Sequence, residues 1–160
     1  MNLLNIKIKL FSLFIFCFIF KLLHGQYCLD YYISPDNDCY YDIDRSYSIY
    51  NQSLSALLVK DSTKIIDIVF YGKREYKISF CTEKNFYPIR IKLINTDTGK
   101  ELYNNFDNLA SNGLEIELEN TMIIRFEVTL LGEKIVNPVY YDEIISCTGI
   151  LIQWTKLEKK

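Results

Sequence analysis

Short apolar runs separated by turn residues constrain this chain more than any other feature. In Glu75 to Cys81, for example, Tyr76, Ile78 and Phe80 share one phase and the residues between them are mostly polar. Side chains of a strand point alternately to its two faces, so this pattern predicts strands with one buried face. The expected strands are Leu54 to Val59, Ile65 to Tyr71, Glu75 to Cys81, Ile89 to Ile94, a short one at Leu102 and Tyr103, Leu114 to Glu119, Met122 to Leu130 and Cys147 to Trp154.

Turn signals between the runs are strong, and helical periodicity is absent outside the first 25 residues. We therefore predict an all-β fold, an antiparallel β-sandwich of jelly-roll type with about eight strands. The expected division is a signal peptide at 1–25, a tyrosine-rich N-terminal arm at 26–50 and the sandwich at 51–160.

The first 25 residues have the layout of a secretory signal peptide. Two lysines precede an apolar run of 11 residues, Leu10 to Phe20, and Gly25 supplies a small residue before the cut. Lys21 ends the run before it reaches the ~20 apolar residues of a membrane-spanning helix. An uncleaved signal anchor is the alternative, because the residue two before Gly25 is leucine. We expect export, to the periplasm or the medium, and no membrane span after cleavage.

Cleavage after Gly25 leaves a chain without histidine and with negative charge. His24 is the only histidine, so no Ser-His or Cys-His pair and no imidazole ligand would remain. The full chain has 18 Lys and Arg against 20 Asp and Glu, and three lysines but no acid lie in the first 25 residues, which gives the mature chain a charge of −5. Nucleic acid is therefore not expected as a partner, since it selects clustered Lys and Arg.

The four remaining cysteines, Cys28, Cys39, Cys81 and Cys147, are expected to form two disulfides, because an even number in an exported chain favours bridges over reactive thiols. Zinc would need close cysteine pairs, which these spacings lack. We expect no metal and no cofactor. Cys81 and Cys147 both lie in the less apolar phase of their strands and are thus placed on one face of a sheet. The predicted pairs are Cys81–Cys147 in the sandwich and Cys28–Cys39 in the arm.

The arm, 26–50, holds seven of the thirteen tyrosines and several aspartates. Asp36-Asn37-Asp38 suggests calcium, yet the glycine and final glutamate of an EF-hand loop are missing. Exposed tyrosines could stack on sugar rings. The simplest interpretation is a disulfide-tied arm that lays its tyrosines over the sandwich and covers an edge strand.

One string has a catalytic look, Glu115-Ile116-Glu117-Leu118-Glu119. It resembles the Glu-x-Asp-x-Glu strand of a family of jelly-roll glycosidases, with Glu117 where that family has aspartate. Retaining glycosidases need two carboxyl groups about 5 Å apart, and alternate residues of a strand share a face. The alternative is an amphipathic strand with its glutamates in water. We expect no enzymatic activity.

The segments "SALLVKDSTKIIDIVFYGKREYKISFC", "IRIKLINTDTGKELYNN", "TMIIRFEVTL" and "SCTGILIQW" resemble a group of small uncharacterised exported proteins of Gram-negative bacteria. The resemblance covers roughly residues 51 to 155. It rests on the strand pattern together with Cys81 and Cys147. It implies a β-sandwich and assigns no catalytic residue.

These observations lead us to expect an exported, non-catalytic β-sandwich protein of the cell envelope with an interaction or structural role. Its partner would be a protein or glycan of the envelope. A carbohydrate-binding module is the alternative, and a minimal glycoside hydrolase comes third. The connection Gly132 to Ile145 is long for a sandwich, so Pro138, Tyr140 and Tyr141 are its candidate binding residues.

Overall fold

The computed structural model describes residues 28–83, 88–109, 112–131 and 145–157. The expected signal peptide at 1–25 and the candidate binding residues Pro138, Tyr140 and Tyr141 lie outside them. The elements are η1 (Tyr31–Ile33), α2 (Asp38–Tyr41), β1 (Ser48–Ile49), β2 (Leu54–Val59), β3 (Thr63–Phe70), β4 (Arg74–Thr82), β5 (Ile89–Asn95), β6 (Glu101–Asn104), β7 (Gly113–Leu118), β8 (Met122–Leu130) and β9 (Ile145–Lys156). None of the helices in the described part is long and apolar enough to cross a membrane.

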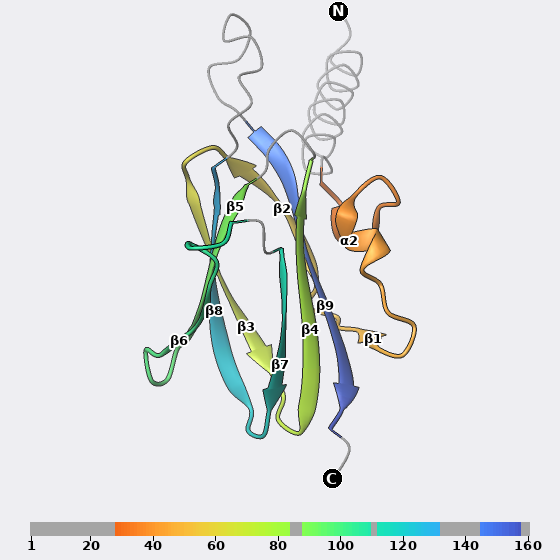
Figure 1. Cartoon of the computed structure of the whole chain (residues 1–160), viewed down its shortest axis with the longest axis vertical. Helices are drawn as coiled ribbons and strands as arrows, with labels where there is room; N and C mark the ends of the chain where they lie inside the picture. Colours follow the sequence, from red (N-terminus) through yellow and green to blue (C-terminus); the bar gives the residue numbers. More distant parts are fainter. Residues whose placement is uncertain (1–27, 84–87, 110–111, 132–144, 158–160) are drawn as a thin grey trace, which may run out of the picture.

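The strands form two antiparallel sheets that face each other (Figure 1). Sheet A has the order β2-β9-β4-β7. Strand β1 lies on the same side of β9 as β2 and pairs with the C-terminal part of β9, whereas β2 pairs with its N-terminal part. Sheet B has the order β3-β8-β5-β6. From β2 to β9 the chain changes sheet at every connection except β5 to β6, which is the connectivity of an eight-stranded jelly roll. The predicted antiparallel β-sandwich is confirmed.

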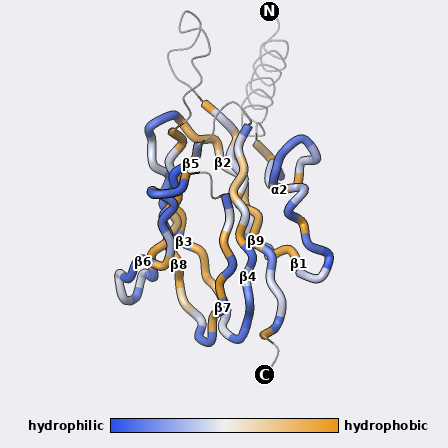
Figure 2. Tube along the Cα trace, viewed as in Figure 1, coloured by the Kyte–Doolittle hydropathy of each residue, from blue (hydrophilic) through white to orange (hydrophobic). Residues whose placement is uncertain are grey.

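The core lies between the sheets and uses one alternate row of each strand. Tyr76, Ile78 and Phe80 of β4 are at most 1 % exposed, and they pack with buried rows of β5, β8 and β9. Figure 2 shows hydrophobic colour along stretches of β3, β8 and β9, mixed colour along β4, and hydrophilic colour at the turns and in much of the arm. The rings of Phe70 in sheet B and Tyr76 in sheet A pack edge to face, with their centroids 4.7 Å apart, so they link the two sheets. Burial of each such side chain stabilises the fold by ~1.5–3 kcal/mol.

The outer face of sheet A is covered by the arm. Cys81 of β4 and Leu151 of β9 are fully buried there, under Cys39 of α2 and beside Tyr31 and Tyr32. Alternation placed Cys81 and Cys147 on the face turned away from the core, and they lie on that face. The arm lies across the two central strands β9 and β4, and it also contacts the edge strand β2, where the Tyr32 N–H donates to Ser55 Oγ at 3.1 Å (Figure 1). The prediction that the arm covers an edge strand therefore holds for η1 over β2, but most of the arm packs on the central strands.

The predicted disulfide pairing is wrong. Cys28 is bonded to Cys147 and Cys39 to Cys81, with Cα separations of 5.4 and 5.5 Å. The register explains why, because the residue directly opposite Cys81 is Gly149, and Cys147 comes two residues before Gly149 in β9. Such diagonal neighbours are ~7–8 Å apart, beyond the usual reach of a disulfide. Each sheet cysteine therefore bonds outward to the arm.

Gly149 provides the space into which the arm docks. A Cβ atom at this position would lie 2.8 Å from both the Cys81 Sγ and the Tyr32 Cα atoms. Any larger residue would push η1 away from the sheet or displace the Cys39–Cys81 bond. The glycine therefore fixes how closely the two layers approach each other.

Candidate binding face

The arm continues past α2 along the outer face of sheet A, where Gln153 of β9 holds it. Gln153 is fully buried and makes two hydrogen bonds with the arm backbone. Its Oε1 accepts from the Asp44 N–H at 2.7 Å, and its Nε2 donates to the Asp42 carbonyl oxygen at 3.0 Å. Both aspartates are thereby fixed beside β4.

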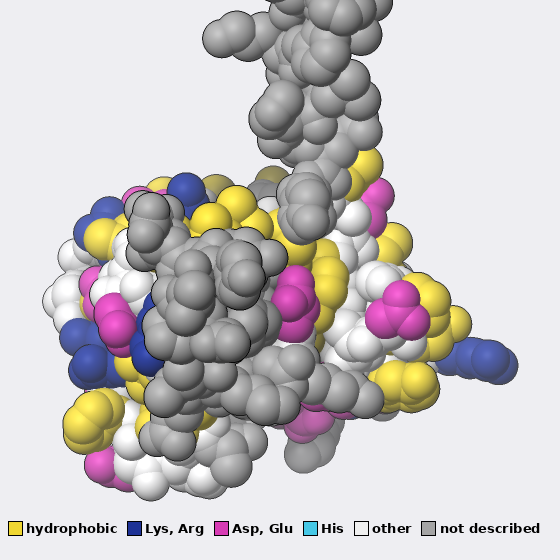
Figure 3. Space-filling view, turned by 90° about the horizontal axis from the view of Figure 1, so that it is seen from above, with side chains coloured by type: hydrophobic (Ala, Val, Ile, Leu, Met, Phe, Trp, Pro, Cys, Tyr) yellow, Lys and Arg dark blue, Asp and Glu magenta, His cyan; other side chains and the backbone are white. Residues whose placement is uncertain are grey.

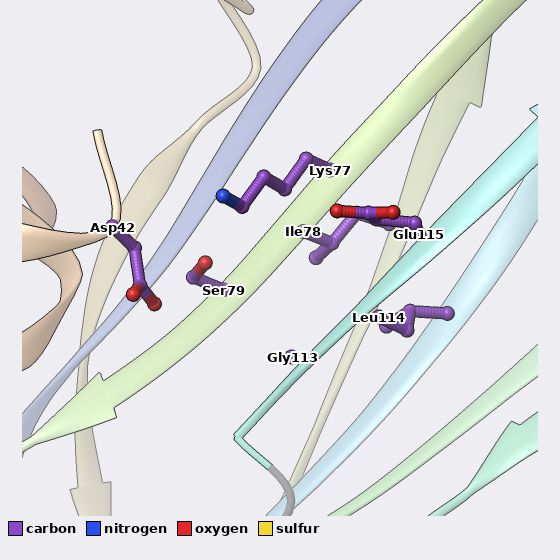
Figure 4. A pocket seen from close by; sticks show the side chains of 7 residues that line it. All are labelled: Asp42, Lys77, Ile78, Ser79, Gly113, Leu114 and Glu115. Carbon is purple, nitrogen blue, oxygen red and sulfur yellow. The ribbon is translucent and has the colours of Figure 1, made fainter. Parts of the chain in front are cut away.

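Between the arm and β7 lies an open hollow of about 310 Å³. Lys77 and Ser79 of β4 form its middle, with Asp42 on the arm side and Glu115 on the β7 side (Figure 4). Lys77 and Glu115 are directly opposite each other in the β4–β7 register. The hollow is therefore lined by one cation between carboxylates from two different elements.

Further acids surround this hollow. Glu75 of β4 is directly opposite Glu117 of β7, a like-charge arrangement that costs stability. The Tyr47 hydroxyl donates to Glu75 Oε1 at 2.8 Å. We call the group of Asp42, Asp44, Glu75, Glu115 and Glu117 around Lys77 the acidic face.

The residues of the acidic face influence one another electrostatically. The hydrogen bond to Glu75, aided by partial burial and by the charges of Glu75, Glu115 and Asp44, raises the pKa of Tyr47 to about 12. Hydrogen bonds from the Ser46 hydroxyl and backbone N–H lower the pKa of Asp44, and the charge of Lys77 lowers it further. Arm, β4 and β7 therefore contribute to a single negative field.

Sheet B has a different charge pattern. The ion pairs found between described residues, Lys92–Glu101 and Arg125–Asp67, both lie on that sheet. Seen from above, basic and acidic side chains are mixed on the sheet B side, while the arm side shows acidic and hydrophobic side chains and one projecting basic side chain (Figure 3). The visible arm side therefore has fewer cations to balance its acids than sheet B has.

The acidic face is suited to binding cationic groups rather than to hydrolysis. Glu115 and Glu117 are exposed on the edge strand, whereas Leu114 and Ile116 pack against the core. A glycosidase needs one of its two carboxyl groups shielded from water to act as an acid. The string at 115–119 is thus an amphipathic strand with its glutamates in solvent.

The segment Asp36-Asn37-Asp38, whose sequence suggested calcium although no metal was expected, has a structural role. Asn37 is buried, its side chain accepts from the Tyr40 N–H as the N-cap of α2, and its amide group donates to the Tyr31 carbonyl. Asp36 and Asp38 are exposed on either side of it. Within the described ranges no three acidic, cysteine or histidine side chains are grouped to hold a metal ion.

The arm tyrosines, for which sugar stacking was the alternative role, differ in exposure. Tyr31, Tyr32 and Tyr50 are partly or fully buried under the arm and in the core. Tyr40 and Tyr41 are exposed, but their rings are edge to face at an angle of 87°. A flat stacking platform would need coplanar rings, so these two do not form one.

Sequence reasoning did not identify the acidic face. Its members come from three elements, and only the docking of the arm brings Asp42 and Asp44 next to Lys77. A usable signal was present, because Lys77 and Gln153 share the polar phase of Cys81 and Cys147. Polar residues in the same row as a cysteine that bonds to the arm are candidates for contact with that arm.

No family model matches the sequence, and none of the curated proteins compared with it does. One solved structure with detectable similarity is PliG of Aeromonas hydrophila, a periplasmic lysozyme inhibitor of g-type lysozyme. It superposes with a TM-score of 0.45 at 6 % sequence identity, over 71 % of this chain and 91 % of that chain. At this level of similarity the inhibitor's partner says nothing about this chain.

Proposed function

We propose that this protein is an exported, non-catalytic binding protein whose acidic face binds a basic region of another protein. The observation that supports this most strongly is the hollow between the arm and β7, where Lys77 lies between the carboxylates of Asp42 and Glu115. Complementary charge favours fast encounter and excludes wrongly charged partners.

Export is supported by two features of the chain. Residues 1–25 have the layout of a signal peptide, and the four cysteines of the described part form two disulfides. Disulfides persist in oxidising compartments and are rare in the cytosol. The cell envelope or the medium is therefore the proposed location.

The fixed position of the arm supports a binding role. A preformed face loses little conformational entropy when a partner binds, and here two disulfides and Gln153 hold it in place. The acids are exposed or half-exposed, so they are accessible to a partner.

The test is site-specific photo-cross-linking in cells that produce the protein. A photoreactive residue in place of Asp42 and, separately, in place of Glu115 should capture the same partner protein, with a basic contact region. The same residue in place of Asp97, in an exposed turn of sheet B, is the control and should not capture it. Capture from all three positions, or only from Asp97, would contradict the proposal.

A carbohydrate-binding module remains the alternative, and a glycan array separates the two. Selective binding to one glycan class that survives Glu115→Gln and Asp42→Asn would replace the proposed function. Binding to anionic glycans alone would do so as well, because the acidic face repels them.

A further inference from the structure

Strand β7 forms one edge of sheet A, and one side of its backbone faces away from the sheet. β4 is its only neighbour, since no strand of the described ranges pairs with its other side. Phe80 N–H donates to the Asn112 carbonyl, which makes Phe80 and Asn112 a hydrogen-bonded pair. Such pairs recur at every second residue of an antiparallel ladder, so Leu114, Ile116 and Leu118 bond to β4. The N–H and C=O groups of Glu115 and Glu117 then point away from the sheet.

The other side of β4 gives the same phase independently. Leu157 N–H donates to the Lys73 carbonyl, so odd-numbered residues of β4 bond to β9. Its even-numbered residues are left for β7, as the Phe80–Asn112 pair requires. The outward direction of the Glu115 and Glu117 backbone groups therefore follows from two ladders.

Both edges of sheet B are blocked or short, in contrast to β7. Gln52 Oε1 accepts from the Val69 N–H and the Tyr50 hydroxyl donates to the Val69 carbonyl, so side chains occupy the edge of β3 at Val69. β6 has four residues and an irregular register with β5. Exposed edges are commonly protected in these ways. β7 has six residues in uninterrupted register, and no side chain of the described residues is hydrogen-bonded to the backbone of Glu115 or Glu117.

Charge on β7 indicates what kind of strand would fit. Glu115 and Glu117 project from the outer face, and Glu117 is directly opposite Glu75. None of these three glutamates belongs to an ion pair found between described residues. Leu114 and Ile116 project inward and are only half-buried at the end of the core. A second copy of β7 would place glutamates opposite glutamates, which disfavours self-pairing.

We propose that β7 receives an extended segment of the protein partner as an added antiparallel strand. Basic side chains of that segment lie opposite Glu115 and Glu117, and its alternate apolar side chains cover Leu114 and Ile116. This rests on the proposed function, because the acidic face supplies the field that attracts the segment. Strand addition of this kind takes affinity from main-chain hydrogen bonds and specificity from alternate side chains.

The probe is a capped synthetic peptide in which lysine and valine alternate, titrated against the full mature protein. Hydrogen exchange should slow at the Glu115 and Glu117 amides when the peptide binds. A peptide in which glutamate and valine alternate, and a peptide with the same composition but lysines and valines in separate blocks, should not produce this protection. Failure of the alternating lysine peptide to bind would overturn the proposal.

Methylation of peptide nitrogens provides a matched control that leaves the protein unchanged. Lysines opposite Glu115 and Glu117 direct their N–H groups to β7, whereas the valine N–H groups point away. N-methyl lysines should therefore abolish binding, and N-methyl valines should preserve it. Equal effects of the two modifications would contradict an added strand.

Two protein variants complete the test. Glu117→Lys should weaken binding about tenfold, since a favourable cross-strand pair becomes a repulsive one, while Asp97→Asn should leave it unchanged. Glu117→Pro removes an outward N–H together with the Glu117 carboxylate. Edge strands tolerate such a proline, and compared with Glu117→Gln, which removes the charge alone, it should also abolish the protection at Glu115. Cross-links to a basic partner from Asp42 together with normal binding by Glu117→Pro would overturn strand addition and leave the proposed function standing.

Discussion

Gln153 shows how much one side chain can position. This residue of β9 is directly opposite Lys77 of β4. It is nevertheless fully buried, because residues 42–44 of the arm lie over it. A buried amide is costly unless it is hydrogen-bonded, and the arm backbone supplies both partners. The side chain therefore places the two arm carboxylates of the acidic face without belonging to that face.

Gln153→Leu should lower the free energy of unfolding by ~1–3 kcal/mol, because the Asp44 N–H and the Asp42 carbonyl lose their partners. Urea denaturation measures the loss, and hydrogen exchange at the Asp44 amide should become faster. Thr155→Val is the matched control, since it changes a polar residue two positions along the same face. If Asp44 exchanges at the same rate in wild type and Gln153→Leu, Gln153 does not hold the arm.

The arm is an element without a core of its own. Its two helices comprise three and four residues, and its stability comes from the sheet through both disulfides and strand β1. The disulfides close loops with sequence separations of 119 and 42 residues. Taken singly, such loops correspond to ~5 and ~4 kcal/mol of unfolded-chain entropy. Cys39 and Cys81 are fully buried, whereas Cys28 is half-exposed.

Cys39→Ala with Cys81→Ala should lower the free energy of unfolding more than Cys28→Ala with Cys147→Ala. Chain entropy alone would make the loss of the Cys28–Cys147 bond the more costly by ~1 kcal/mol. Removal of the fully buried Cys39 and Cys81 sulfur atoms, however, also leaves a cavity that should cost ~2 kcal/mol or more. Denaturant unfolding of the two double variants gives the order. Peptide mapping without reductant should first recover Cys28 linked to Cys147 and Cys39 linked to Cys81; a Cys28–Cys39 peptide would contradict the fold described above.

Whole-molecule stability should depend on pH in the alkaline range, because three arm tyrosines favour their neutral form in the folded state. Burial first of all raises the pKa of Tyr31 and of Tyr50 from 10.0 to about 12, and the hydrogen bond to Glu75 does the same for Tyr47. A group with a raised pKa contributes stability that is complete below its unfolded value. That contribution should decrease as the pH rises from about 10 through about 12.

The measurement is the denaturant midpoint as a function of pH, together with the tyrosinate absorbance of the folded protein. Tyr47→Phe should be less stable at neutral pH but should lose less stability above pH ~10, since one linked group is gone. Tyr41→Phe is the control for the loss of a tyrosine hydroxyl, because Tyr41 is 77 % exposed and its removal should leave the midpoint at neutral pH unchanged. A wild-type midpoint that is flat across this range would contradict the linkage.

Local sequence signals were sufficient to predict the strands, but not the contacts between residues far apart in the sequence. Alternation and turn residues located β2 and β8 to the residue, since each strand buries one face and ends at a turn. The disulfide pairing depends on the offset between β4 and β9, which strand patterns do not encode. The acidic face depends on the docking of the arm, and that in turn needs the absence of a side chain at Gly149. Long-range register was the missing information in both cases.

The Cys28–Cys147 bond also decides how the molecule carries mechanical load. Tension applied between the two ends of the chain enters at Cys28, crosses the covalent bond and leaves through β9. The two bonded cysteines are 119 residues apart in sequence, and the segment between them cannot be extended while the bond is intact. The applied force is therefore not transmitted along strands β2 to β8. Under force, β9 would detach from β1, β2 and β4, while the segment between the two bonded cysteines could not be drawn out. Reduction of this one bond would convert a stiff tether into an extensible one.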